Sequence, residues 1–236
     1  MPTFRLDAPL HRGALAILDG DDAHHLRDVL RVRVGDGLTV CAAGEYWSAT
    51  VDAIERRWVT ARVVAPTLPP WQPVRPVHLY QAVPKARGIE AVIQHASELG
   101  AATLTPLITA RTIGRREAAG RTDRWQAVAA AAQRQCGRPQ PLAIHPVRPL
   151  TEALAELAGA SVAVPGAPLL ALPDGGGPLR VVIGPEGGLS PAEQRLLETH
   201  GGHPFGLPAW TLRAATATAA VLAVVNQEVE RLAIGY

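Results

Sequence analysis

The segment with the clearest capacity for chemistry is a glycine-rich turn between an apolar run and a helix start. Val181-Val-Ile leads into Gly184-Pro-Glu-Gly-Gly188, and Ser190-Pro-Ala-Glu193 has the pattern of a capping box with proline at the first helical position. Glycines let the backbone approach a ligand closely and present its amides. The turn is therefore a candidate binding loop, and the alternative is an ordinary strand–helix connection.

A second segment of this kind is Gly206-Leu-Pro-Ala-Trp-Thr-Leu-Arg213, which leads from a predicted strand through a tight loop to a predicted helix. In open α/β sheets, ligands bind beyond the carboxyl ends of the strands. Both segments follow such ends, so we expect them to share a site.

Basic residues are concentrated in the middle third of the chain. Residues 73–150 contain 11 basic and 4 acidic residues, a net charge of +7, whereas residues 1–72 carry −1 and residues 151–236 carry −4. A basic block suits a polyanionic partner, and it equally suits arginines that solubilise helix faces. Lys85 is the single lysine in a chain with 22 arginines.

Composition and motif searches exclude several classes of protein. The chain is 47% hydrophobic and 19% charged, which is typical of a folded protein. Its two cysteines, Cys41 and Cys136, form no CxxC pair, and its eight histidines show no HExxH spacing, so we expect neither a disulfide framework nor a metal site. No apolar run reaches 18 residues and the N-terminus lacks a signal peptide, so we expect a cytoplasmic protein without membrane contact.

Two common nucleotide-binding folds are also disfavoured. The chain has no GxxxxGK[ST] motif, which excludes a P-loop. The predicted strand 77–83 is followed by Pro84-Lys-Ala-Arg87 rather than by a glycine-rich loop, which argues against a Rossmann dehydrogenase or a Rossmann methyltransferase.

The elements that must position these loops fall into two domains, predicted at residues 1–72 and 73–236. Five prolines between Pro66 and Pro76 predict a linker, because such a run forms neither a helix nor an inner strand. Before it, alternating segments at 38–41, 47–51 and 58–64 and a short helix at 21–29 predict a small barrel of about five strands. After it, strands alternate with helices, which predicts an α/β domain with a mostly parallel sheet and helices on both faces. We expect strands at 77–83, 102–108, 142–147, 161–164, 179–183 and 204–207, and helices at 87–99, 122–135, 151–157, 190–201 and 214–232.

Taken together, the motifs resemble the SPOUT methyltransferases, and in particular the family that methylates N3 of a uridine in bacterial 16S ribosomal RNA. The resemblance covers nearly the whole chain. It rests on His24-His-Leu-Arg-Asp-Val-Leu-Arg31, Gly35-Asp-Gly-Leu38, Pro84-Lys85, Ile93-Gln-His-Ala-Ser-Glu-Leu-Gly100, Pro106-Leu, Arg124-Trp125, Gln135-Cys-Gly-Arg138, Ile183-Gly-Pro-Glu-Gly-Gly188 and Leu212-Arg213.

The resemblance implies a PUA-like RNA-binding β-barrel followed by a SPOUT α/β domain with a deep C-terminal trefoil knot. It implies S-adenosyl-L-methionine as cofactor, 16S rRNA within the small ribosomal subunit as substrate, and a homodimer whose pocket is completed across the interface. The cofactor-binding residues it implies are Pro165, Gly184, Pro185, Glu186, Gly187, Gly188, Leu207, Thr211 and Leu212.

Arg213 is the candidate catalytic residue, because a positive group near the base oxygens favours the deprotonated, nucleophilic uridine N3. The alternative is a structural arginine at a helix end. The sequence identifies no general base; Glu186 either serves as one or orders its loop. The candidate RNA-binding residues are Arg27, Arg31, Lys85, Arg87, Arg134, Gln135 and Arg138. The last three could instead cap a helix C-terminus.

Four positions differ from the family's usual motifs. Arg134 stands where glutamate is usual, Trp210 and Ala215 replace an arginine and a glutamate, and His95 is the basic residue of its motif. We expect His95 to pack, and Trp210 either to stack on a base or on adenine, or to fill the core. Because of these changes, two alternative functions stay open: an rRNA-binding or assembly factor with weakened catalysis, and a SPOUT enzyme for another RNA site.

Overall fold

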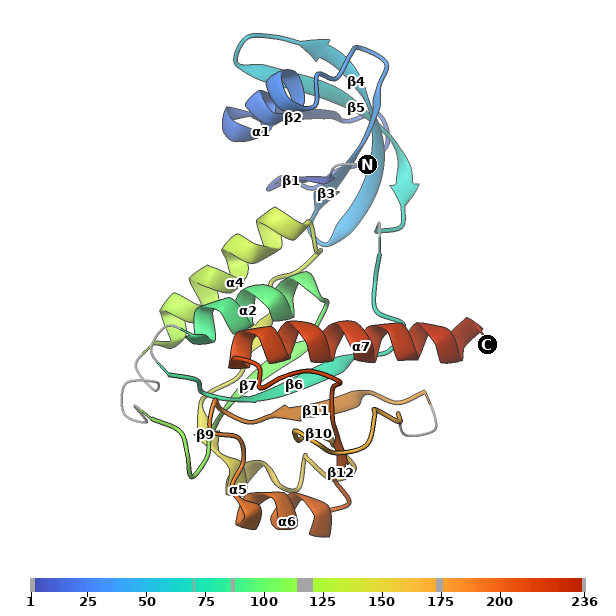
Figure 1. Cartoon of the computed structure of the whole chain (residues 1–236). Helices are drawn as coiled ribbons and strands as arrows, with labels where there is room; N and C mark the ends of the chain where they lie inside the picture. Colours follow the sequence, from blue (N-terminus) through green and yellow to red (C-terminus); the bar gives the residue numbers. More distant parts are fainter. Residues whose placement is uncertain (1–2, 70, 86–87, 114–120, 173–175, 235–236) are drawn as a thin grey trace. The chain divides into compact units, whose positions relative to one another are not determined.

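The computed structural model describes residues 3–69, 71–85, 88–113, 121–172 and 176–234 (Figure 1). The chain divides into two compact units. The first comprises residues 1–72 together with residues 133–140, and the second comprises residues 73–132 and 141–236.

The first unit is built on a curled five-stranded sheet in the order β1-β3-β4-β5-β2. Only β1 and β3 run parallel. On β5, Val59, Ala61 and Val63 are buried while Trp58 and Arg62 are exposed, so alternation places one face in the core. The five strands confirm the predicted small β-barrel-like unit. Their bounds are β1 (Thr3–Leu6), β2 (Leu15–Asp19), β3 (Gly37–Ala42), β4 (Glu45–Ile54) and β5 (Trp58–Thr67).

The predicted helix at residues 21–29 is two joined segments, α1 (Gly20–His24) and the π-helical η1 (His25–Val29). The buried side chains of Ala23 and Leu26 attach them to the core of the sheet.

The predicted linker begins too early, because β5 extends through Pro66 to Thr67. Pro66 pairs with Trp47 on β4, whereas the pairing of β5 with β2 reaches only Arg62. Pro66 therefore has a strand on one side only, the position in which a residue without an N–H donor is tolerated.

The second unit contains a parallel sheet in the order β12-β10-β11-β6-β7-β8, and β9 also pairs with β7. Every pairing in it is parallel, which confirms the predicted fold class. The strands are β6 (Val77–Ala82), β7 (Thr103–Ile108), β8 (Ala143–Ile144), β9 (Arg148–Pro149), β10 (Ser161–Ala163), β11 (Leu179–Ile183) and β12 (His203–Phe205).

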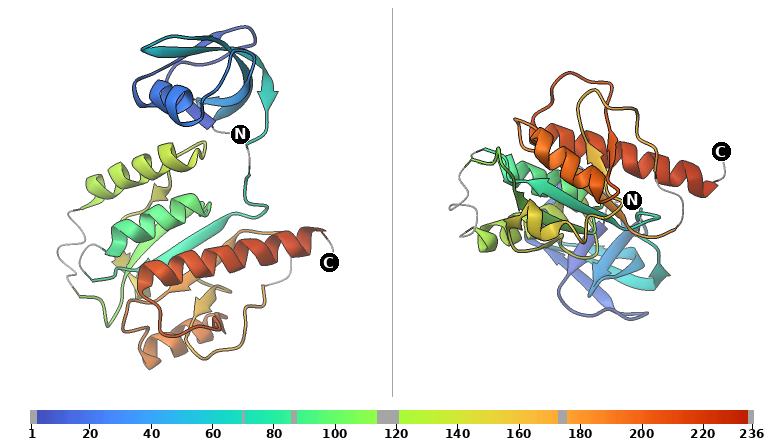
Figure 2. Two further views of the ribbon diagram at one scale, coloured as in Figure 1. Left: turned by 45° about the horizontal axis from the view of Figure 1, so that its top comes forward. Right: turned by 90° about the horizontal axis from the view of Figure 1, so that it is seen from below.

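Helices cover both faces of this sheet. Figure 1 shows α2 and α7 on one face and α5 and α6 on the other, and the left view of Figure 2 shows the same division. Two separate apolar clusters match the two faces: Leu79 and Val181 pack with α2 and α7, whereas Leu107 and Val182 pack with α5 and α6. The helices are α2 (Gly88–Glu98), α4 (Thr122–Cys136), α5 (Leu150–Ala153), α6 (Pro191–Thr199) and α7 (Ala214–Ile234).

Two predicted elements differ clearly from expectation. The strand expected at 142–147 is reduced to β8, residues 143–144, and is followed by His145-Pro146, where proline cannot donate to the sheet. β9 lies beyond the predicted range. The helix expected at 151–157 ends at Ala153, and tighter turns such as Glu156 N to Ala153 O (3.0 Å) continue it.

The loops after β10 and β12 lie side by side. Gly206 N donates to Pro168 O (2.7 Å), and Val164 N donates to Phe205 O (2.8 Å). A Cβ on Gly206 would lie 2.4 Å from Ala167 O, so only glycine fits at this contact. The trefoil knot predicted in this region stays a prediction.

No helix in the described part of the chain is long and apolar enough to cross a membrane. Within the same residues, no group of three or more His, Cys, Asp or Glu side chains is placed to hold a metal ion.

Candidate active site

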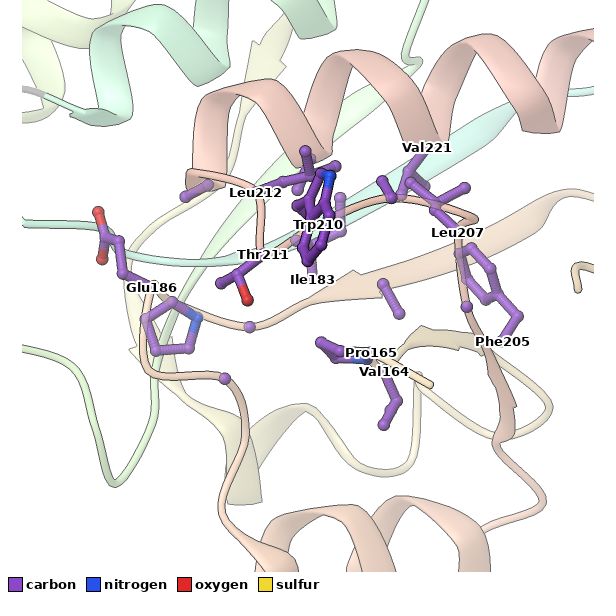
Figure 3. Close-up of a pocket in the computed structure, with 18 residues that line it drawn as sticks. Val164, Pro165, Ile183, Glu186, Phe205, Leu207, Trp210, Thr211, Leu212 and Val221 are labelled. Atoms are coloured by element: carbon purple, nitrogen blue, oxygen red, sulfur yellow. The ribbon is translucent and has the colours of Figure 1, made fainter. Parts of the chain in front are cut away.

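A pocket lies at the carboxyl ends of three neighbouring strands of the second unit (Figure 3). Its walls come from the last residues of β10, β11 and β12, from parts of the loops that follow them up to residues 165, 188 and 212, and from the first turns of α7. These strands are adjacent in the order β12-β10-β11, so their loops meet at one edge. The cavity has a volume of about 110 Å³. Both candidate loops therefore contribute to one site.

The glycine turn after β11 is held by its own backbone. Gly188 N donates to Pro185 O (2.7 Å), and Gly188 has a φ of +70°, a conformation that favours glycine. A Cβ on Gly184 would lie 2.9 Å from Leu189 N, so the turn closes too tightly there for a side chain. Glycine is therefore required at the two positions for different causes: the backbone conformation at Gly188 and the lack of space for a side chain at Gly184.

The capping box predicted after this turn is present. Glu193 N donates to Ser190 Oγ (3.3 Å), and Ser190 N donates to Glu193 Oε2 (2.8 Å). The other oxygen of Glu193 accepts a hydrogen bond from Ala110 N (2.6 Å), in the loop after β7. The carboxylate therefore fixes the start of α6 to a neighbouring loop.

Sequence reasoning missed the loop after β7, which braces the glycine turn. Besides the Ala110 contact, Arg111 donates from its guanidinium to Gly187 O. The sequence offered one indication of this role: Ala110 and Arg111 follow the carboxyl end of a predicted strand, where ligand-binding loops of parallel sheets lie.

Glu186 lies at one end of the pocket, and in Figure 3 its carboxylate points away from the other labelled side chains. It accepts hydrogen bonds from the backbone N–H of Lys85, 3.2 and 3.3 Å from its two oxygens. This contact supports the loop-ordering interpretation of Glu186, and it extends that order to the segment after β6.

Most of the predicted cofactor-binding residues line this pocket. Those that do are Pro165, Gly184, Pro185, Glu186, Gly188, Leu207, Thr211 and Leu212. Gly187 lies in the same turn without lining the pocket, and its carbonyl is occupied by Arg111. Arg213 is exposed and follows the lining residue Leu212; its carbonyl accepts from Ala217 N (2.8 Å) at the start of α7.

The three unusual residues near α7 have distinct surroundings. Trp210 lines the pocket with 95% of its surface exposed, so the interpretation that it fills the core is wrong. Ala215 is half-buried, and its carbonyl oxygen lies 2.9 Å from His95 Nδ1. A carbonyl only accepts, so Nδ1 carries the proton and His95 attaches α2 to the start of α7, in agreement with the expected packing role.

The candidate RNA-binding residues do not all come together. Arg134 and Arg138 line a small hollow with Arg5 in the first unit, and burial lowers the pKa of Arg138. Gln135 and Lys85 are exposed, and Arg87 lies outside the described residues. Gly137, with a φ of +75°, ends α4, and the Gln133 amide donates to Pro139 O (3.0 Å). The alternative helix-capping role of Arg134, Gln135 and Arg138 stays a prediction.

Arg27 and Arg31 lie at and just after η1. Arg27 donates to Asp28 and to Arg56 O, and its hydrogen bond is the main reason the pKa of Asp28 is lowered to about 2. Arg27 also borders a second hollow of the first unit with Arg57 and Trp58, neither of which the sequence singled out. Arg31 is exposed, with a φ of +53°.

Comparisons with known proteins match both parts of the chain. A family model described as an RNA methyltransferase domain matches residues 71–226, and one described as an RNA methyltransferase PUA domain matches residues 18–64. The chain is 33% identical to the ribosomal RNA small subunit methyltransferase E of Mycobacterium bovis, over 94% of this chain and 90% of that one. It is 26% identical to the protein of that name from Bacillus subtilis, over 91% of each.

Two solved structures are similar along almost the whole chain. Ribosomal RNA small subunit methyltransferase E of Neisseria gonorrhoeae, bound to S-adenosylmethionine, has a TM-score of 0.72 and 26% identity, with 97% of this chain and 98% of that chain covered. A methyltransferase of Legionella pneumophila in complex with the same cofactor has a TM-score of 0.67 and 27% identity, with 96% and 97% covered.

Proposed function

Because the chain belongs to the ribosomal RNA small subunit methyltransferase E family, we propose that it transfers a methyl group from S-adenosylmethionine to 16S rRNA. The proposed target atom is N3 of one uridine in the small subunit. The observation that carries the proposal is the pocket of the second unit, in which the two glycine-containing loops meet at the carboxyl ends of β10, β11 and β12.

The pocket suits such a cofactor on its own chemistry. Its walls combine apolar side chains, such as Ile183, Phe205 and Val221, with the backbone groups of the turn at 184–188. Apolar walls suit the flat face of a purine, while backbone groups supply directional hydrogen bonds. Gly184 leaves no room for a side chain, which keeps the backbone of the turn close to the cavity.

When bound, S-adenosylmethionine supplies a methyl group already activated by its sulfonium. The protein has to hold donor and acceptor in line and exclude water. We assign the holding role to Pro165, Gly184–Gly188, Leu207, Thr211 and Leu212. Glu193 and Arg111 support it by bracing the turn from the α6 side and from the loop after β7.

The acceptor also needs activation, because uridine N3 carries a proton and is a poor nucleophile until that proton leaves. A cation beside the base oxygens lowers the pKa of the imide. We propose Arg213 for this role, since it is exposed directly after the lining residue Leu212 and its side chain is free to approach a base.

We further propose that residues 1–72 form a PUA-like RNA-binding domain and residues 73–236 the methyltransferase domain of a cytoplasmic homodimer. Contacts to RNA phosphates are assigned to Arg27, Arg31, Lys85, Arg87, Arg134, Gln135 and Arg138. Phosphate contacts supply salt-dependent affinity, while specificity comes from a base extruded into the pocket.

The test uses small ribosomal subunits from cells that lack this modification. Purified protein and S-adenosylmethionine are added, the rRNA is digested, and nucleosides are analysed by mass spectrometry. We expect 3-methyluridine in the 16S rRNA, lost in R213A and retained in R195A, which removes an exposed arginine on α6. Cofactor binding without methyl transfer would instead support an rRNA-binding or assembly factor, and another methylated nucleoside would support a different target site.

A further inference from the structure

A buried polar pair, Gln81 and Thr218, lies behind the wall of the pocket. Both side chains are 0% exposed. Gln81 is on β6 and shares its face with Val77 and Leu79, which belong to the apolar cluster under α2 and α7. Neither residue of the pair lines the pocket. A buried amide in an apolar cluster lowers the stability of the fold unless its donors and acceptor have hydrogen-bond partners.

The hydrogen bonds of Gln81 fix its orientation. Its Nε2 lies 2.9 Å from Ala82 O, 3.2 Å from Gly184 O and 3.4 Å from Ile183 O. Carbonyl oxygens only accept, so the NH₂ end of the amide must face them. Its Oε1 accepts a hydrogen bond from Thr218 Oγ1 (2.9 Å).

Thr218 continues the connection to α7. Its Oγ1 lies 2.9 Å from Ala214 O, one turn earlier in the helix, and shares its proton between that carbonyl and Gln81. Ala214 is the first residue of α7, directly after the loop that carries Leu207, Thr211 and Leu212. Gly184 opens the glycine turn on the opposite wall, and Gly184 and Ala214 both line the pocket.

We propose that Gln81 and Thr218 are positioning residues that hold the glycine turn and the start of α7 at the spacing the cofactor requires. The inference rests on the proposed function for the identity of the ligand. A leucine at position 81 would satisfy the apolar cluster around it, so the fold alone does not need an amide there. The amide of Gln81 instead connects the two walls of the pocket: it donates to Gly184 O on one wall and accepts from Thr218 on the other. Loss of either hydrogen bond would change the spacing of the walls, although Gln81 and Thr218 do not contact the ligand themselves.

The test measures the Kd of S-adenosylmethionine by titration calorimetry for four variants of the full chain. T218V removes the hydroxyl at nearly constant shape, and we expect its Kd to rise about tenfold. T218S restores the hydroxyl, and we expect a Kd within about threefold of the unsubstituted protein. T105V is the matched control, because Thr105 is also 0% exposed in the same sheet but hydrogen-bonds to His145 outside the pocket (3.0 Å). We expect T105V to leave the Kd unchanged.

Q81E adds a pH-dependent readout, taken only under conditions in which unfolding measurements show the variant to be folded. An ionised carboxylate would face three carbonyl oxygens, so binding should weaken more than tenfold at pH 8. A protonated carboxyl can donate to a carbonyl and still accept from Thr218, so binding should recover as the pH falls, relative to the unsubstituted protein at each pH. Thermal unfolding of every variant shows which of them are folded. If Q81E does not fold, the comparison of T218V with T218S tests the positioning role.

The outcomes separate this inference from the proposed function. Equal binding by the unsubstituted protein, T218V and Q81E would overturn the positioning role, as would equal weakening by T218V and T105V. Failure of the unsubstituted protein to bind S-adenosylmethionine would overturn the proposed function, and the inference with it.

Discussion

Replacing Gly184 by alanine tests whether the glycine turn sets cofactor affinity. The added Cβ would lie 2.9 Å from Leu189 N and 3.1 Å from Gly188 C, whereas ordinary contacts begin at 3.4 Å. The backbone must therefore open by about half an ångström, and both atoms it must move belong to the turn itself. Insertion of a methyl group into a packed site of this kind costs about 1–3 kcal/mol.

If the turn must return to its unsubstituted conformation when the cofactor binds, the whole of this cost is subtracted from the free energy of binding. At 1.4 kcal/mol for each factor of ten, the Kd of S-adenosylmethionine should rise between about 5-fold and 150-fold. Titration calorimetry gives the Kd, and urea unfolding shows how much of the cost falls on the fold instead.

The matched control is G177A, the same substitution in the same unit. A Cβ at Gly177 meets nothing within 4 Å and its φ is not in the left-handed region, so we expect its Kd to be unchanged and its stability to change by less than about 0.5 kcal/mol. A G184A protein that binds the cofactor as tightly as G177A would refute the reasoning, because the turn would then relax without affecting the site.

Three further predictions concern the cap of α6, an ion pair and the exposed tryptophan. S190A should lower the free energy of unfolding by about 1 kcal/mol in urea, because Glu193 N loses its capping partner; an unchanged value would contradict this. Glu156, whose pKa is lowered to about 2 mainly by its hydrogen bond to Arg148, stabilises the fold above pH 4.5 and loses that effect as the pH falls toward 2. E156Q should therefore be less stable than the unsubstituted protein at pH 6, by under about 1 kcal/mol because the pair is exposed. In urea unfolding the difference should shrink below pH 4.5 and disappear only as the pH approaches about 2. W210A should change the free energy of unfolding by less than about 0.5 kcal/mol, since Trp210 is 95% exposed. If the ring stacks on a base, the same variant should lower methylation of small subunits about 5- to 150-fold. Reduced stability with unchanged methylation would contradict the stacking role.

Local signals in the sequence predicted the elements that frame the pocket. The bounds of β11 agree at both ends, because a short apolar run stands between a proline and a glycine turn. The start of α6 follows from Ser190, Pro191 and Glu193, whose contacts span only three residues. Such features depend on neighbours in the chain, so a single sequence specifies them.

Elements that depend on distant partners were predicted less well. The break between β8 and β9 comes from Pro146, but the pairing of both pieces with β7 is set by tertiary structure. Pro66 lies in a strand because β2 ends before reaching it, which is a property of the partner strand and not of the proline itself. The sequence pattern carries no record of where a neighbouring strand stops.

The residues of the site also fall into a set that the sequence predicted and a set that it did not, and the difference between the two sets has a chemical cause. The resemblance predicted eight of the residues that line the pocket, because the glycines and their neighbours are close in sequence and form recognisable motifs. It did not predict the residues that hold the lining in place, namely Gln81, Ala110, Arg111 and Thr218. These bind backbone carbonyls or side chains from other parts of the chain, as Gln81 does with Gly184 and Arg111 with Gly187. A carbonyl belongs to every residue, so the partner leaves no mark in the sequence, and only the fold shows that an ordinary glutamine or arginine supports the site.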